Sequence, residues 1–258
     1  MPVPRIFTSG SYSYLPSVFQ YSAGVMAEPG YRLEQIRFKH AVPLQDGFKA
    51  VESRLRFLGR PFTAFAHCEL RSPKQFDDQG FIDFNKTYVR QLQSWNIYTP
   101  AVDGVDAINP VARTNVCPEH HGPQEVSMYA FTYSVPSTAK QTSFVISGGG
   151  DARKGSEPYK DRIIAFGDVS QAGLRKKMAF VIEEMANRLR SFDLKWSDVT
   201  KVQAYSVHDI ALLVDELLAK PGLIQHGLTW HFARPPVAGL DYEMDLRGSV
   251  NELFSDDL

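Results

Sequence analysis

Cysteines, long runs of basic residues and long apolar stretches are all scarce in this sequence of 258 residues. The only cysteines, Cys68 and Cys117, are too few for a disulfide framework, which favours a reducing compartment. No stretch approaches the roughly 20 consecutive apolar residues that a membrane-spanning helix needs. The first residues, Met-Pro-Val-Pro-Arg, also lack the apolar region of a signal peptide. We therefore expect a cytoplasmic protein with no membrane partner.

Positive and negative charges are nearly balanced, and the formal net charge is −1. The longest run of lysine and arginine is confined to residues 175–177. A nucleic-acid-binding surface normally carries a larger basic patch, so no nucleic-acid partner is expected.

Cofactor motifs are incomplete as well. The glycines at residues 148–150 follow an expected strand but lack the Lys-Ser/Thr pair of a phosphate-binding loop. Residues 117–121, Cys-Pro-Glu-His-His, hold metal-ligand types without the paired spacing typical of a zinc site. We expect neither a metal ion nor an organic cofactor.

Hydrophobic periodicity predicts helices and strands along the whole chain. The strongest helix, residues 171–192, places Leu174, Met178, Val181, Met185 and Leu189 on one face. Further helices are expected at residues 45–58, 76–95 and 209–218. Strands are expected at residues 18–24, 36–40, 62–70, 111–117 and 126–133, and again at 143–148, 162–166, 199–207, 228–232 and 240–246.

The same order, β-β-α-β-α-β-β, therefore occurs once in each half of the chain. It predicts an α+β fold of two tandem units, each a mostly antiparallel sheet with two helices on one face. The boundary is expected between residues 1–136 and residues 137–258. A single domain spanning the whole chain is the alternative.

Several short segments resemble the Rid/YjgF family, the reactive-intermediate deaminases. Residues 109–114 (Asn-Pro-Val-Ala-Arg-Thr) are similar to the Pro-x-Ala-Arg-Ser/Thr segment of that family, and residues 81–88 (Phe-Ile-Asp-Phe-Asn-Lys-Thr-Tyr) to its Phe-x-x-x-Asn-x-x-Tyr helix. Residues 145–148 (Val-Ile-Ser-Gly) and 198–202 (Asp-Val-Thr-Lys-Val) are similar to two of its strand segments. The resemblance implies two tandem chorismate-mutase-like units of the Rid/YjgF type.

The resemblance also implies an activity, namely hydrolysis of an imine or enamine that bears a carboxylate, with water attacking the imine carbon and ammonia leaving. An aminomuconate-like intermediate of aromatic breakdown is one candidate substrate. In that family an arginine binds the substrate carboxylate, and the matching residue here is Arg113. A guanidinium suits this role because its planar fork of donors matches a carboxylate.

The remaining candidates follow from the same positions. Asn85 and Glu243 join Arg113 as candidate catalytic residues. Candidate substrate-binding residues, besides Arg113, are Thr114, Tyr12, Ser22, Tyr133 and His120.

The second half departs from the family pattern, since Gly227 stands where its arginine would be. In the first half, Ser127 or Met128 replaces the family's strand glutamate, whereas Glu243 lies close to that position in the second half. One site is therefore expected to be composite, with Arg113 from one unit and acidic or tyrosyl groups from the other.

Two other functions stay open. The missing second arginine also fits a non-catalytic Rid-like ligand-binding or regulatory protein, and a chorismatase-like enzyme on the same fold is the further alternative. A lone unit would leave one face of its sheet uncovered. Since the family covers that face by forming trimers, a homotrimer is expected, with a small carboxylated molecule as the other partner.

Overall fold

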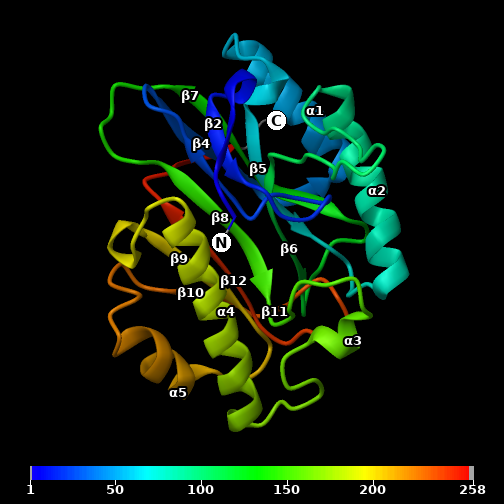
Figure 1. Ribbon diagram of the computed structural model, residues 1–258, viewed down its shortest axis with the longest axis vertical. Coiled ribbons are helices and arrows are strands. Elements are labelled where there is room, and N and C mark those ends of the chain that lie inside the picture. The colour runs from blue at the N-terminus through cyan, green and yellow to red at the C-terminus, as the bar shows by residue number, and fades with distance from the viewer. Residues whose placement is uncertain (1, 256–258) are drawn as a thin grey trace.

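The computed structural model describes residues 2–255, which form two β-sheets with helices on their outer faces (Figure 1). Sheet I has the strand order β1 (Arg5–Phe7), β2 (Tyr12–Leu15), β3 (Gly24–Ala27), β8 (Phe144–Gly150), β12 (Glu243–Gly248), β9 (Lys201–Tyr205), β10 (Thr229–His231). Sheet II has the order β11 (Ala233–Arg234), β6 (Ala112–Pro118), β5 (Phe65–Arg71), β7 (Ser127–Pro136), β4 (Tyr31–Pro43), β13 (Asn251–Ser255).

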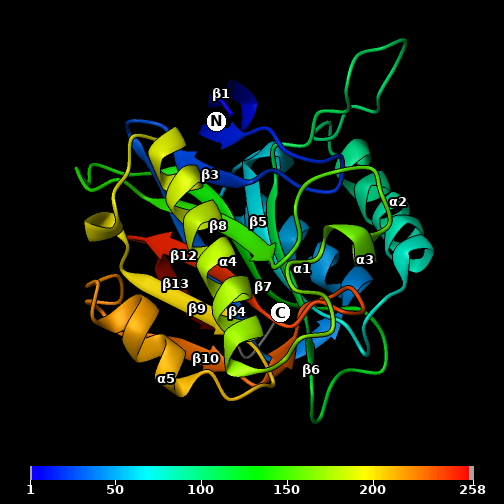
Figure 2. The same cartoon turned by 60° about the horizontal axis from the view of Figure 1, so that its bottom comes forward.

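The helices lie on the outside of this pair of sheets (Figure 2). They are α1 (Leu44–Phe57), α2 (Asp78–Ser94), α3 (Tyr159–Arg162), α4 (Gln171–Ser191) and α5 (Ala211–Val214), and α5 continues into a π-helical turn, Asp215–Ala219. Helices α1 and α2 pack on sheet II, and α4 and α5 pack on sheet I. The result is a four-layer α/β/β/α arrangement.

Local sequence explains the long helices. Ser170 caps α4, its hydroxyl accepting a hydrogen bond from the Gly173 amide at 3.2 Å, and Asp77 caps α2 in the same way through the Gly80 amide at 2.6 Å. The apolar stripe of α4 is buried against sheet I. The helices expected at residues 45–58, 76–95 and 171–192 match α1, α2 and α4.

Three of the expected elements differ from the structure. Residues 162–166, expected as a strand, instead comprise the last residue of the short helix α3, an isolated bridge at Ile163 and a run of turns. Residues 18–23 form only isolated bridges before β3, which begins at Gly24, and the helix expected at 209–218 is divided between α5 and the π-helical turn.

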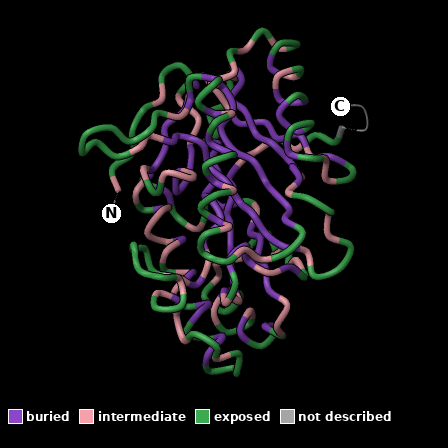
Figure 3. The backbone as a smooth tube through the Cα atoms, turned by 90° about the vertical axis from the view of Figure 1, so that its right-hand side faces the viewer, coloured by how far each residue is buried: buried purple, intermediate pink, exposed green. Residues whose placement is uncertain are grey.

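The two sheets face each other, and their inner faces are buried. An apolar cluster between them includes Tyr12, Val25, Ala112 and Val145. In Figure 3 the buried backbone runs through the middle of the molecule, whereas exposed segments lie in the loops and outer helix turns. Each sheet thus covers the face of the other within one chain.

A layer of buried polar residues also joins the sheets. The Arg247 guanidinium on β12 donates to the Glu69 carboxylate on β5 at 2.7 Å, and Arg71 binds the same carboxylate at 3.1 Å. The Thr114 hydroxyl on β6 donates to the Asp245 carboxylate on β12 at 2.8 Å. Buried charges are tolerated only with such partners, so these bonds restrict how the sheets can sit on each other.

The prediction of two tandem Rid/YjgF-like units is wrong. The expected boundary at residues 136–137 lies at the end of β7, but strand pairings join residues from its two sides. Strand β3 pairs with β8 of the second half, and β13 pairs with β4 of the first half. Segments 1–136 and 137–258 therefore each contribute strands to both sheets, and neither forms the compact repeat that the element order suggested.

Candidate active site

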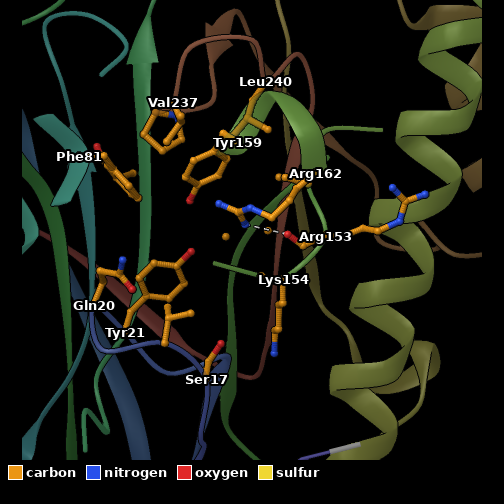
Figure 4. A pocket seen from close by; sticks show the side chains of 18 of the residues that line it. Ser17, Gln20, Tyr21, Phe81, Arg153, Lys154, Tyr159, Arg162, Val237 and Leu240 are labelled. Carbon is orange, nitrogen blue, oxygen red and sulfur yellow. Dashed lines mark hydrogen bonds between the residues drawn. The ribbon is translucent and has the colours of Figure 1, made fainter. Parts of the chain in front are cut away.

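A pocket of about 430 Å³ is lined by residues of β8 and β12 in sheet I and of β6 in sheet II. Its walls come from residues 17–21, the start of α2, β6, the end of β8, the loop of residues 152–162, helix α4 and the segment that leads into β12. Figure 4 shows lining side chains from residues 17–21, α2, the loop of residues 152–162 and the segment before β12. Both halves of the chain contribute to this pocket.

Arg113 lines the pocket from β6 and is only 2% exposed. Its Nη2 donates to the Asn85 side-chain oxygen at 2.6 Å, while its buried Nη1 has no hydrogen-bond partner within residues 2–255. No carboxylate of the described chain forms an ion pair with it. An unpaired buried cation is unfavourable, so this guanidinium is suited to receive an anion from a ligand.

Aromatic rings surround the Arg113 guanidinium. The ring of Tyr88 lies 4.7 Å from its central carbon, that of Tyr21 5.1 Å and that of Phe84 5.5 Å. Phe84, Asn85 and Tyr88 share one face of α2, because residues three or four apart are neighbours on a helix. The rings hold the cation by cation–π attraction without neutralising it.

Glu243 lies at the start of β12 and is 4% exposed. Its carboxyl packs against the backbone of Gly148, where a Cβ atom would come within 2.1 Å of the Glu243 Oε1 atom. Burial, reinforced by the nearby Asp245 carboxylate, raises the pKa of Glu243 well above its usual value, although Arg188 and Arg113 act in the opposite direction. This shift favours the protonated form of the Glu243 carboxyl.

Arg188, from helix α4, forms the floor beside Glu243. Its Nη1 donates to the Ser147 carbonyl at 2.8 Å, and its guanidinium packs against Gly149, where a Cβ would meet it at about 3.0 Å. Burial lowers the pKa of Arg188. The glycine run of β8 thus lets Glu243 and Arg188 approach the strand from its two faces.

The other wall is the loop that contains α3. Figure 4 shows the hydroxyls of Tyr21 and Tyr159 and the guanidinium of Arg162 pointing toward one another. Burial raises the pKa of Tyr21 and raises that of Tyr159 to about 12, so both phenols are hydrogen-bond donors at neutral pH.

The structure brings two of the three residues predicted as catalytic to this pocket. Arg113 and Glu243 line it within a single chain, and Asn85 supports Arg113 from behind. Thr114 and Ser22 lie beside the pocket. Thr114 bonds Asp245, and the Ser22 amide bonds the Val111 carbonyl at 2.8 Å, which fixes Tyr21 next to β6.

The remaining predicted residues lie elsewhere. The buried Tyr12 hydroxyl donates to the Phe65 carbonyl at 2.9 Å, and the Tyr133 hydroxyl accepts from Arg54 at 2.9 Å. His120 is exposed and stacks on Phe232 at 5.7 Å. None of these three side chains lines the pocket.

Sequence reasoning missed Arg188, Tyr21, Tyr159 and Arg162. A signal existed for Arg188, since it continues the spacing of Met178, Val181 and Met185 on the buried face of α4. A charged side chain on the apolar face of a helix is unusual, and here Arg188 lines the pocket. Arg162 had no such signal because its segment was expected to be a strand.

The described chain offers no alternative metal centre. Within residues 2–255 no three histidine, cysteine, aspartate or glutamate side chains gather closely enough to hold an ion. Glu119, from the segment at 117–121, instead pairs with Arg234 at 2.7 Å. Over the same residues, no helix is long and apolar enough to cross a membrane.

Fold and pocket define an α+β chain with a pocket in which the buried Arg113 guanidinium has no carboxylate partner among residues 2–255 and the buried carboxyl of Glu243 lies nearby. The family model described as 2-aminomuconate deaminase CnbZ matches residues 4–253. The chain therefore belongs to the 2-aminomuconate deaminase CnbZ family, and the predicted deaminase, an enzyme acting on carbon–nitrogen bonds, is confirmed at that level.

The prediction of a Rid/YjgF-family protein is wrong, because the matching family is CnbZ and its model spans both expected units. The segments that suggested Rid/YjgF are short, and they specify strand ends, one helix and one arginine rather than a whole domain.

Two individual similarities accompany this match. A 2-amino-5-chloromuconate deaminase from Comamonas testosteroni is 56% identical over 254 residues, which covers 98% of this chain and 99% of that protein. A chorismatase crystal structure aligns with 96% of this chain and 80% of its own at 16% identity and a TM-score of 0.44. A likeness at that score supports no inference about function.

Proposed function

We propose that this chain deaminates 2-aminomuconate, or a close analogue such as its 5-chloro derivative, by hydrolysis during the breakdown of aromatic compounds. The observation that carries the proposal is the unpartnered Arg113 guanidinium in a pocket that also holds the high-pKa carboxyl of Glu243. The similarity to a 2-amino-5-chloromuconate deaminase supports the choice of substrate.

Arg113 binds the carboxylate next to the amino-bearing carbon. Its free Nη1 and the pocket-facing part of its fork form charge-assisted hydrogen bonds, and Asn85 holds the guanidinium in place. The aromatic rings around Arg113 keep water away from this contact, which strengthens it. The conjugated chain of the substrate then lies along the pocket past Glu243.

Glu243 supplies and recovers the proton. Its protonated carboxyl donates to a carbon of the enamine, which converts C=C–NH₂ into CH–C=NH₂⁺ and leaves a carboxylate. Water adds to the iminium carbon and gives its proton to that carboxylate. The resulting carbinolamine expels ammonia and leaves the oxo acid, so the net reaction consumes one water per ammonia released.

The test is ammonia release from enzymatically generated 2-aminomuconate by the wild type and two variants. Arg113→Ala should lower kcat/KM by about 100-fold through loss of the carboxylate contact. Glu243→Gln, which preserves shape, should lower kcat by about 100-fold or more with a smaller change in KM.

Lys160→Ala serves as the control, since Lys160 is exposed on α3 and does not line the pocket. A wild type that releases no ammonia from 2-aminomuconate would refute the proposal. Retention of full activity by Glu243→Gln would refute the role assigned to that carboxyl.

A further inference from the structure

Arg162 lines the pocket without a carboxylate partner in the described part of the chain. Two of its nitrogens are fixed by backbone carbonyls: Nε donates to Glu157 at 2.7 Å and Nη1 to Arg153 at 2.8 Å. The guanidinium lies 4.1 Å from the centre of the Tyr159 ring. Its orientation is therefore set by the protein, while its charge is not neutralised.

The short helix that carries Arg162 is anchored to the pocket wall. The Tyr159 amide donates to the Asp78 carboxylate at the start of α2, at 3.1 Å. Ile163 is buried in an apolar cluster with Phe81 and Leu240. These contacts hold Arg162 at the rim of the pocket.

Tyr21 separates Arg162 from Arg113. The Tyr21 ring packs on the Arg113 guanidinium at 5.1 Å, whereas its hydroxyl points toward Arg162 and Tyr159 (Figure 4). The pocket thus has two positively charged ends, each with an arginine that no carboxylate of residues 2–255 neutralises. Two separated cations in one pocket match a ligand with two separated negative charges.

We propose that Arg162, together with the hydroxyls of Tyr21 and Tyr159, binds the second carboxylate of the substrate and so selects dicarboxylates over monocarboxylates. This inference rests on the proposed function for the placement of the first carboxylate at Arg113. Two phenol donors and one guanidinium supply hydrogen bonds to both carboxylate oxygens. A monocarboxylate of the same length leaves these donors in the pocket without an acceptor, which lowers its affinity.

The proposal is tested with two stable ligands that differ only at the end expected to bind Arg162. Muconate in its trans,trans form and sorbate share the same six-carbon diene, but sorbate carries a methyl group in place of the second carboxylate. Their dissociation constants are measured by calorimetric titration of the wild type, Arg162→Ala, Arg162→Lys and Lys160→Ala. Muconate should bind the wild type at least about tenfold more tightly than sorbate.

In Arg162→Ala the preference for muconate should fall to about twofold or less, and Arg162→Lys should retain part of it because lysine keeps the charge but not the planar fork. The readout is the ratio of the two dissociation constants. A general loosening of the loop would weaken the binding of both ligands and leave this ratio unchanged. Lys160→Ala removes the same charge from the same helix and should keep the wild-type ratio.

Equal binding of muconate and sorbate by the wild type would overturn the proposal. So would an Arg162→Ala variant that keeps the wild-type ratio, or a Lys160→Ala variant that loses it to the same degree. These ligands undergo no deamination, so the result is independent of ammonia release. If the protein prefers muconate through Arg162 but releases no ammonia from 2-aminomuconate, the second-carboxylate site is supported and the proposed deamination is refuted.

Discussion

Asn85 supports Arg113 without cancelling its charge. Its side-chain oxygen accepts one Arg113 proton at 2.6 Å, and its amide donates to the Phe81 carbonyl at 2.7 Å, which fixes the orientation of the amide. A carboxylate at this position would bind the guanidinium more strongly and compete with the substrate.

Asn85→Asp is therefore expected to raise KM by about tenfold or more with a folded protein, because the introduced carboxylate occupies Arg113. Asn85→Ala removes the acceptor without adding charge and should raise KM less. Steady-state kinetics of ammonia release compare the two variants. Equal KM values for both would contradict the competition and indicate that Asn85 acts through geometry alone.

Glu243 also links the stability of the protein to pH. Its pKa in the folded protein is raised above the ordinary value of 4.5, chiefly by burial. A raised pKa means that this carboxyl stabilises the fold fully below its unfolded pKa and that this stability is lost as pH rises through the folded pKa.

The glutamine side chain of the Glu243→Gln variant cannot ionise, so the variant should not lose this stability as pH rises. The melting temperature of the variant relative to the wild type should therefore increase as pH is raised from about 5 to 9. Calorimetric scans across this range measure the difference. A difference that stays constant with pH would show that Glu243 titrates normally in the folded protein.

The sequence identified part of the site at this scale. Residues 109–114 led to Arg113, and the resemblance to the family's strand glutamate led to Glu243. Tyr21 and Tyr159 could not be found in the same way, because they reach the pocket through irregular segments whose path depends on tertiary contacts. Burial by distant segments also sets the pKa of Glu243, and no local pattern encodes it.

The end of strand β8 has a composition that suits the side chains packed against it. Its last three residues are glycines, and added Cβ atoms would meet different neighbours along the strand: Glu243 at 2.1 Å for Gly148, and a Leu240 methyl at 3.2 Å for Gly150. The glycines, which lack the rest of a phosphate-binding loop, here let side chains approach the backbone of β8 closely.

Gly148→Ala should displace the Glu243 carboxyl and lower kcat by about tenfold or more, since a contact of 2.1 Å cannot persist. Gly150→Ala meets only the end of a flexible side chain and should cost much less activity. Kinetics and thermal melting of the two variants are compared. Similar kcat values in both would show that the Gly148 contact does not position Glu243.

Periodicity predicted the long helices well and the irregular wall of the pocket poorly. Helix α4 has a full apolar stripe and a capping serine, so its sequence specifies it locally. Residues 159–166 form one helical turn followed by further turns because their apolar side chains dock onto α2 and the loop before β12. Tertiary packing outweighs local propensity there.

The whole molecule explains why the expected tandem arrangement does not hold. The order of helices and strands in each half does not determine which strands pair across the chain midpoint. Strand β3 lies beside β8, and β13 lies beside β4, so both sheets depend on residues from both halves. The sheet face that suggested a trimer is covered by the second sheet of the same chain; the homotrimer stays a prediction.

Fragments test the division at residues 136–137. Segment 137–258 alone lacks β1, β2 and β3 and exposes the edge of β8, so it should aggregate or remain unfolded. Segment 1–136 should do the same without β13 and sheet I. Circular dichroism and thermal melting of each fragment, beside the two co-expressed, measure this. A fragment that melts cooperatively alone would establish an independent domain.

The crossing of strands also has a consequence for synthesis. During translation β3 emerges long before its neighbour β8, and β4 emerges long before its neighbour β13. The nascent chain must keep early strand edges unpaired until distant partners arrive, and such non-local pairing slows folding and favours aggregation. Arg113 and Glu243 likewise meet only after β12 has left the ribosome, so no nascent form that ends before β12 holds the assembled pocket.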